Sequence, residues 1–60
     1  MKEYTMYAVY DTDNDLYSVK TLDFLRKDCI KRFFGSKEYY NEVKHLGWAI
    51  KKVKVTIEEI

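Results

Sequence analysis

The stretch that decides the fold is the longest β-favouring run in the chain, Trp48-Ala49-Ile50-Lys51-Lys52-Val53-Lys54-Val55-Thr56-Ile57. Aromatic and β-branched residues favour a pleated, half-buried surface, so the run predicts a long strand from Trp48 to about Glu58. The backbone groups of a strand need hydrogen-bonding partners, which the earlier part of the chain must supply. We therefore expect the rest of the chain to be arranged around this strand.

The apolar residues of this strand do not keep one phase. One parity holds Trp48 and Ile50, and the other holds Val53, Val55 and Ile57, with Lys51-Lys52 in between. Either a β-bulge at Lys51-Lys52 restores the phase, or the two sets face opposite sides of the sheet. In both cases we expect the valine set to face the core. In the second case Trp48 and Ile50 would lie on a sheet face without helices, where an apolar patch is typical of an interface.

Two shorter strands are predicted near the start of the chain. Residues 3–10, EYTMYAVY, are rich in strand-forming residues and apolar on both faces. Asp11 to Asp15 is a cluster of Asp and Asn, which favours a hairpin loop of about four or five residues. The second strand of this hairpin is expected over residues 16–20.

Two helices are predicted between the hairpin and the last strand. Residues 22–34 show an apolar stripe at helical spacing, with Thr21 as the N-cap and Gly35 just past the end. Ser36 is placed to cap a second helix over 37–46, which Gly47 ends. Phe24 points away from the apolar stripe, and is either a lone exposed aromatic or an anchor for a partner.

The element order β-β-α-α-β predicts an α+β fold with a single domain over residues 1–60. We expect two layers, with a mainly antiparallel three-stranded sheet and helices packed on one face. Sixty residues bury a small core, and one cysteine excludes an internal disulfide. Tight packing or self-association is therefore the expected additional support.

The charge distribution leaves open a second class of partner. The net charge is +1. Residues 1–20 carry two lysines against four acidic residues, a net of −2, whereas residues 26–54 carry nine basic residues against three acidic ones, a net of +6. Basic residues interleaved with tyrosines can hold single-stranded nucleic acid, so a nucleic-acid binder using residues 26–54 is the alternative function.

The sequence offers no convincing metal, cofactor or catalytic set. Asp11, Asp13 and Asp15 resemble the opening of a calcium loop, but the Gly and Glu that such a loop needs are replaced by leucines. Cys29 lies on the apolar stripe, where a core role is expected, and His45 is the only histidine. We therefore predict a protein that is not an enzyme and that uses no cofactor and no metal.

Two segments, Tyr7-Ala8-Val9-Tyr10-Asp11 and Gly47-Trp48-Ala49-Ile50-Lys51-Lys52-Val53-Lys54-Val55, resemble small accessory proteins encoded by phages and prophages. Such proteins often bind a host or defence protein and block or redirect it by surface contact. The resemblance therefore implies a non-enzymatic protein-binding module or inhibitor. It carries over no functional residue.

A partner surface is predicted on the sheet face without helices or on the free edge of the last strand, for a host protein or for a homodimer. The residues expected to contact the partner are Tyr7, Tyr17, Trp48, Ile50, Lys51 and Lys52. No run is long enough to span a membrane, and Met1-Lys2-Glu3-Tyr4 lacks the apolar core of a signal peptide. These features predict a cytoplasmic location without membrane partners, in the host cell if the protein is phage-encoded.

Overall fold

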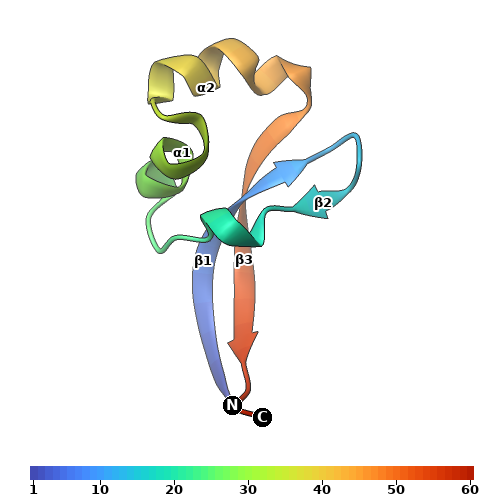
Figure 1. Ribbon diagram of the computed structural model, residues 1–60, viewed down its shortest axis with the longest axis vertical. Coiled ribbons are helices and arrows are strands. Elements are labelled where there is room, and N and C mark those ends of the chain that lie inside the picture. The colour runs from blue at the N-terminus through green and yellow to red at the C-terminus, as the bar shows by residue number, and fades with distance from the viewer.

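The fold is α+β, as predicted, with a three-stranded antiparallel sheet and two short helices (Figure 1). The computed structural model describes residues 1–60. The strands are β1 (Lys2–Asp11), β2 (Leu16–Tyr17) and β3 (Trp48–Ile57), and the α-helices are α1 (Arg26–Phe34) and α2 (Lys37–Val43). Short 3₁₀ helices, η1 (Val19–Thr21) and η2 (Lys44–Leu46), follow β2 and α2. None of the helices is both long enough and apolar enough to cross a lipid bilayer.

The first and last strands form one long ladder in the middle of the molecule. The sheet order is β2-β1-β3. The pairing of β1 with β3 runs without a break from Lys2 opposite Ile57 to Asp11 opposite Trp48. This continuous register contains no β-bulge at Lys51-Lys52, so the two apolar sets of β3 face opposite sides of the sheet.

We name the two faces of this ladder after β3 residues. The Trp48 face carries Thr5, Tyr7, Val9, Trp48, Ile50, Lys52 and Lys54. The Val55 face carries Tyr4, Met6, Ala8, Tyr10, Lys51, Val53, Val55 and Ile57. In an antiparallel pair, directly opposite residues share a face, which fixes both lists.

The predicted helix 22–34 begins later than expected, at Arg26. Its first residues are extended because Asp23 pairs with Tyr7, exchanging backbone hydrogen bonds of 2.7 and 3.1 Å. Thr21 belongs to η1 and does not cap the helix. Gly35 ends α1 with a φ of 88°. The second helix is confirmed, and Ser36 accepts the Tyr39 backbone N–H at 3.1 Å as its cap.

Most of the core lies under α1, on the side of the sheet that carries Trp48, and Ala8 is buried on the opposite face. The buried apolar residues are Ala8, Val9, Cys29, Ile30 and Tyr40. The rings of Phe33 and Phe34 lie 5.2 and 6.1 Å from the Trp48 ring. The expectation that Trp48 and Ile50 lie on a face without helices is therefore wrong. The valine set is less buried than predicted, because Val53 and Val55 are half-buried and Ile57 is 56% exposed.

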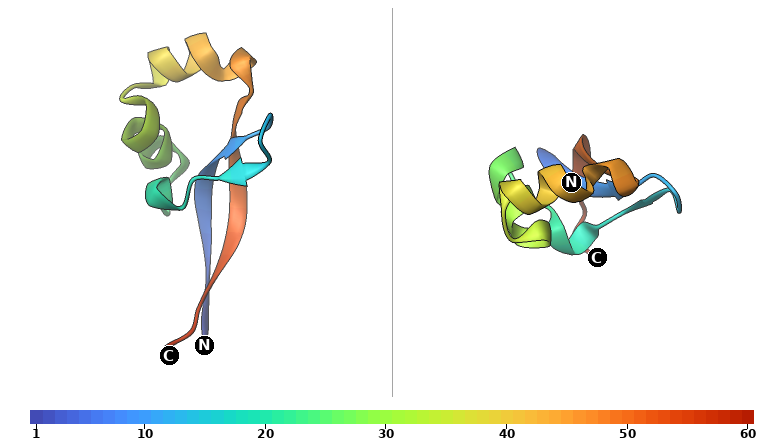
Figure 2. Two further views of the ribbon diagram at one scale, coloured as in Figure 1. Left: turned by 45° about the vertical axis from the view of Figure 1, so that its right-hand side comes forward. Right: turned by 90° about the horizontal axis from the view of Figure 1, so that it is seen from above.

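The lower half of the β1–β3 ladder projects away from the helices. Figure 1 and the left view of Figure 2 show this ribbon alone, with both chain ends at its tip and α2 at the opposite end. The molecule measures 39 × 23 × 15 Å along its principal axes. The helical segments are too short to cover a ladder of this length, and this explains why only 6 of 60 residues are buried.

Candidate functional site

The Val55 face is an apolar surface that the fold leaves open. Its ladder residues Tyr4, Met6, Val53 and Val55 are half-buried. Val19 and Leu22, which leave the hairpin on this side, border its upper part. Val19 is 72% exposed. A contiguous apolar surface on a small domain commonly marks a site of interaction.

An open hollow of about 380 Å³ lies on this face between the ladder and the segment after β2. Six of its seven lining residues are apolar: Ala8, Tyr17, Val19, Leu22, Val53 and Val55, with Lys54 as the seventh. The floor is Ala8, whose side chain is fully buried. A small residue in the floor with larger side chains around it gives a recess that an apolar side chain of a partner can enter.

An aromatic and cationic cluster closes the upper end of the Val55 face. The rings of Tyr10 and Tyr17 are 4.7 Å apart, and the Lys51 Nζ lies 5.6 Å from the Tyr10 ring centre. The Tyr10 hydroxyl donates to Asp15 at 2.5 Å. This hydrogen bond to a carboxylate, followed by desolvation, raises the pKa of Tyr10 to about 12. The cluster therefore presents a polar rim with a neutral tyrosine at physiological pH.

Phe24 joins the same face near the free end of the ladder. It is 59% exposed, and its ring meets Tyr4 edge-on at a centroid distance of 6.0 Å. Phe24 is thus exposed but not isolated, because it extends the aromatic surface begun by Tyr4. This edge-to-face contact with Tyr4 holds the Phe24 ring in place and leaves the rest of the ring open to a partner.

The structure divides the six residues predicted to contact a partner between two faces. Tyr17 and Lys51 belong to the Tyr10 cluster on the Val55 face. The other four, Tyr7, Trp48, Ile50 and Lys52, lie on the Trp48 face. Of these, Trp48 contacts the aromatic side chains of α1, whereas Lys52 is exposed. The six residues therefore do not form one surface.

The candidate surface includes residues that sequence reasoning assigned elsewhere. The sequence pattern predicts Val53, Val55 and Ile57 in the core, and it does not group Val19 or Phe24 with them. Strand parity does place the valines with Tyr4 and Met6 once the register is known. The absence of a covering element could not be predicted, because it depends on which face α1 meets.

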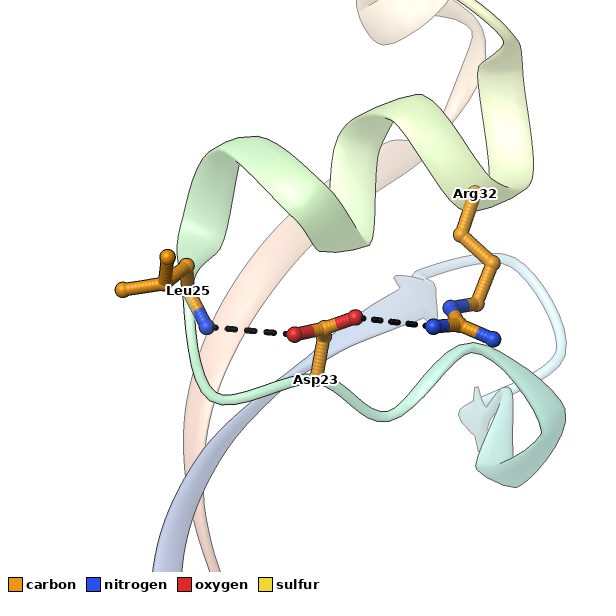
Figure 3. Close-up of polar contacts among 3 residues, drawn as sticks. All are labelled: Asp23, Leu25 and Arg32. Carbon is orange, nitrogen blue, oxygen red and sulfur yellow. Dashed lines mark hydrogen bonds and ion pairs between the residues drawn. The ribbon is translucent and has the colours of Figure 1, made fainter.

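Asp23 attaches the extended segment beside β1 to helix α1 (Figure 3). Its carboxylate accepts from the Arg32 guanidinium at 3.1 Å and from the Leu25 backbone N–H at 3.4 Å. Although desolvation acts in the opposite direction, these donors hold the pKa of Asp23 below its ordinary value. Together with the backbone pairing to Tyr7, they fix the position of the adjacent Phe24.

The thiol of Cys29 is a core group. The residue is fully buried, and desolvation raises the pKa of the thiol, with a smaller contribution in the same direction from Asp23. A reactive cysteine needs an exposed thiol with a lowered pKa. The environment of Cys29 therefore suits packing and does not suit nucleophilic chemistry.

Several of the basic residues of segment 26–54 gather near the starts of α1 and α2. Arg26, Lys27 and Lys37 line an open hollow of about 260 Å³ together with Ile30. Arg26 and Lys44 also lie 5.9 and 6.0 Å from the Tyr40 ring centre. Lys51, Lys52 and Lys54 lie on β3, distributed over both faces of the ladder. Only part of the predicted basic surface is therefore continuous.

Comparison of this chain with protein-family models, with curated proteins and with solved structures gave no match. The resemblance to phage accessory proteins stays a prediction from the two quoted segments.

Proposed function

We propose that the protein is a non-enzymatic protein-binding module of the phage accessory type, which acts by surface contact on a host or defence protein. The observation that carries the proposal is the open Val55 face. A chain of 60 residues that leaves half-buried valines, a recess and exposed aromatic rings on one side presents a surface suited to a second protein. The buried thiol of Cys29 agrees with a role that does not depend on nucleophilic catalysis.

The composition of the face favours a protein partner over a small molecule. Exposed aromatic anchors beside a shallow apolar recess, with a lysine and tyrosines at the rim, follow the pattern of a protein interface. Small-molecule sites are more enclosed and surround most of the ligand surface. The Val55 face has no comparable walls at the free end of the ladder, where Phe24 and Ile57 are exposed.

Affinity capture with a pair of matched variants tests the proposal. The test variant is Val19→Asp with Phe24→Asp, which places two charges on the Val55 face at exposed positions. The control is Leu25→Asp with Leu46→Asp, at positions that are 51% and 61% exposed and outside the ladder. From host-cell extract, the wild type and the control should retain the same protein, and the test variant should lose it.

Both variants must show the far-ultraviolet circular dichroism of the wild type before capture is compared. Purified partner should then bind the wild type in a titration and show at least about a tenfold weaker affinity for the test variant, as expected when interface anchors are replaced. Equal retention of the partner by both double variants would refute the assignment to this face.

Nucleic-acid binding is the second candidate function, and the hollow lined by Arg26, Lys27 and Lys37 is the observation that favours it. A groove without acidic residues could neutralise backbone phosphates, and such binding weakens steeply as salt increases. Retention of single-stranded DNA or RNA at low salt, lost on adding salt and on replacing Lys27 and Lys37 with Glu, would support it. Lack of retention at low salt would exclude it.

A further inference from the structure

The outer edge of β3 carries a row of backbone groups without a strand partner. Tyr7 exchanges backbone hydrogen bonds with Asp23, so its N–H and C=O point away from β3. Tyr7 and Lys52 are therefore a non-hydrogen-bonded pair, and Lys52 directs its own N–H and C=O to the open side. Because this direction alternates along a strand, the backbone N–H and C=O groups of Ile50, Lys54 and Thr56 point to the open side as well. This edge can accept another antiparallel strand.

The sequence of this edge is complementary to itself in reverse. Two copies of the segment can be placed antiparallel with Val55 opposite Val55. In this register no lysine lies opposite another lysine. The segment is Ile50-Lys51-Lys52-Val53-Lys54-Val55-Thr56-Ile57-Glu58-Glu59-Ile60. Lys52 then meets Glu58, and Lys51 meets Glu59, each pair occurring twice by symmetry. The remaining pairs are Lys54 with Thr56, Val53 with Ile57, and Ile50 with Ile60.

Neighbouring registers are less complementary. A two-fold axis through Thr56 pairs Lys54 with Glu58 but leaves Lys52 opposite Ile60 and Val53 opposite Glu59. A two-fold axis through Val53 places Lys52 opposite Lys54, and an axis through Lys52 or Lys54 places that lysine opposite its own copy. Like charges directly opposite on one face of a sheet are destabilising, whereas opposite charges are stabilising. Lysines on an edge usually discourage pairing. Here the two glutamates that follow β3 favour the register about Val55, because it alone places two lysines of each copy opposite glutamates.

We propose that two copies of this chain associate through the β3 edges, antiparallel, about a two-fold axis at Val55. The result is a six-stranded sheet in the order β2-β1-β3-β3-β1-β2. The pairs Lys54–Thr56 and Lys52–Glu58 exchange backbone hydrogen bonds, because all four residues belong to the set that faces outward. The pairs Val55–Val55 and Val53–Ile57 bring apolar side chains together between them on the Val55 face.

The residues that this pairing uses are accessible in the single chain. Lys51, Lys52, Glu58 and Glu59 are all exposed. Glu58 to Ile60 follow β3 without regular structure, so they are free to extend the strand. In Figure 1 the lower half of β3 has β1 on one side and no element on the other. The inference does not depend on the proposed function, because a self-pairing edge needs no other protein.

Charge reversal provides the test. Variant A carries Lys51→Glu and Lys52→Glu, and variant B carries Glu58→Lys and Glu59→Lys. Each alone opposes like charges across the two-fold axis, so its self-association should weaken by more than about tenfold. Mixed together, A and B have opposite charges at every one of these positions, and they should form a heterodimer. Sedimentation equilibrium up to about 1 mM protein measures this association.

Two controls separate edge pairing from other causes. A variant with Lys20→Glu and Lys37→Glu changes the net charge as variant A does but lies off the edge, and it should dimerise like the wild type. Thr56→Pro removes one outward N–H without touching the β1–β3 hydrogen bonds, and it should be a folded monomer. The wild type should sediment at twice 7.3 kDa. A monomeric wild type, unchanged association of A and B separately, or a mixture that stays monomeric would each overturn the proposal.

Discussion

Replacing Trp48 with Ala should unfold a large part of the protein, because this side chain joins the long ladder to α1. Its ring packs against Phe33 at 5.2 Å and against Phe34 at 6.1 Å. Truncating a fully buried Phe or Trp costs about 3–5 kcal/mol. Trp48 is half-buried, so about half of that value applies, and aromatic pairs add about 0.5–1.5 kcal/mol each. Together, about 1.5–2.5 kcal/mol for the truncation and about 1–3 kcal/mol for the two aromatic pairs give an expected loss of about 2.5–5.5 kcal/mol in the free energy of unfolding.

A loss of this size is severe for a chain of this length, whose core supplies about 3–5 kcal/mol in total. Urea unfolding followed by far-ultraviolet circular dichroism measures it, since the variant lacks the tryptophan needed for fluorescence. The matched control is Phe24→Ala, which truncates an aromatic residue that is 59% exposed. A urea midpoint for Trp48→Ala equal to that of the wild type would refute the packing argument and return Trp48 to the list of interface candidates.

Three other perturbations follow from local geometry. In a spectrophotometric titration, Tyr10 should ionise near pH 12, later than a tyrosine with the ordinary pKa of 10.0, and Asp15→Asn should lower its pKa. Since the pKa of Tyr10 is raised in the folded state, the stability that its hydrogen bond to Asp15 contributes is present below pH 10 and is lost as the pH rises through 12. A Tyr10 with the ordinary tyrosine pKa would contradict this hydrogen bond. The pKa of Asp23 is lowered in the fold, so its contribution is present above the ordinary value of 3.8 and is lost as the pH falls through the folded pKa. In Arg32→Gln, the melting temperature should fall less than in the wild type as the pH is lowered through the acid range. An unchanged dependence of the melting temperature on pH would count against the Arg32–Asp23 ion pair. Gly47→Ala should destabilise more than Gly35→Ala, although both glycines have positive φ. A Cβ at Gly47 would lie 3.2 Å from the Thr12 Oγ1, which its hydrogen bond to the Gly47 carbonyl holds in place, and 2.9 Å from the Asp13 Oδ2, whereas a Cβ at Gly35 meets nothing within 4 Å. Gly35→Ala alone should cost about 1–2 kcal/mol, and equal losses in thermal unfolding would contradict the Gly47 contact.

The elements of the fold could be predicted from the sequence because each has a local cause. The Asp-rich loop, the Ser36 cap and the glycines at 35 and 47 act within a few residues, and all three mark element ends in the structure. The start of α1 could not be predicted in this way. Asp23 is diverted from the helix by backbone pairing with Tyr7, a contact between residues distant in sequence.

The candidate site was harder to predict than the fold, because exposure depends on coverage. The phase change in β3 correctly indicated two apolar sets, but periodicity cannot say which set a helix will cover. In the structure α1 covers the set that contains Trp48, because the rings of Phe33 and Phe34 pack against the Trp48 ring. Val53 and Val55 are left half-buried as a result, since the chain has no further helix to place over them.

The two proposed surfaces meet at Val55. In the β3–β3 pairing, the two-fold axis is perpendicular to the sheet, so both Val55 faces lie on the same side. The Val53–Ile57 pairs then join the two apolar stripes into one surface, about twice as wide as that of a single chain.

A partner that needs this doubled surface would bind one dimer, and variant A would then weaken capture although Val19 and Phe24 are unchanged. A partner that fits a single face would bind variant A as tightly as the wild type. Conversely, the variant with Val19→Asp and Phe24→Asp leaves every residue of the edge intact, and it should lose the partner while still forming dimers. The residues that pair the edges and those that line the recess therefore allow self-association and partner binding to be switched off one at a time.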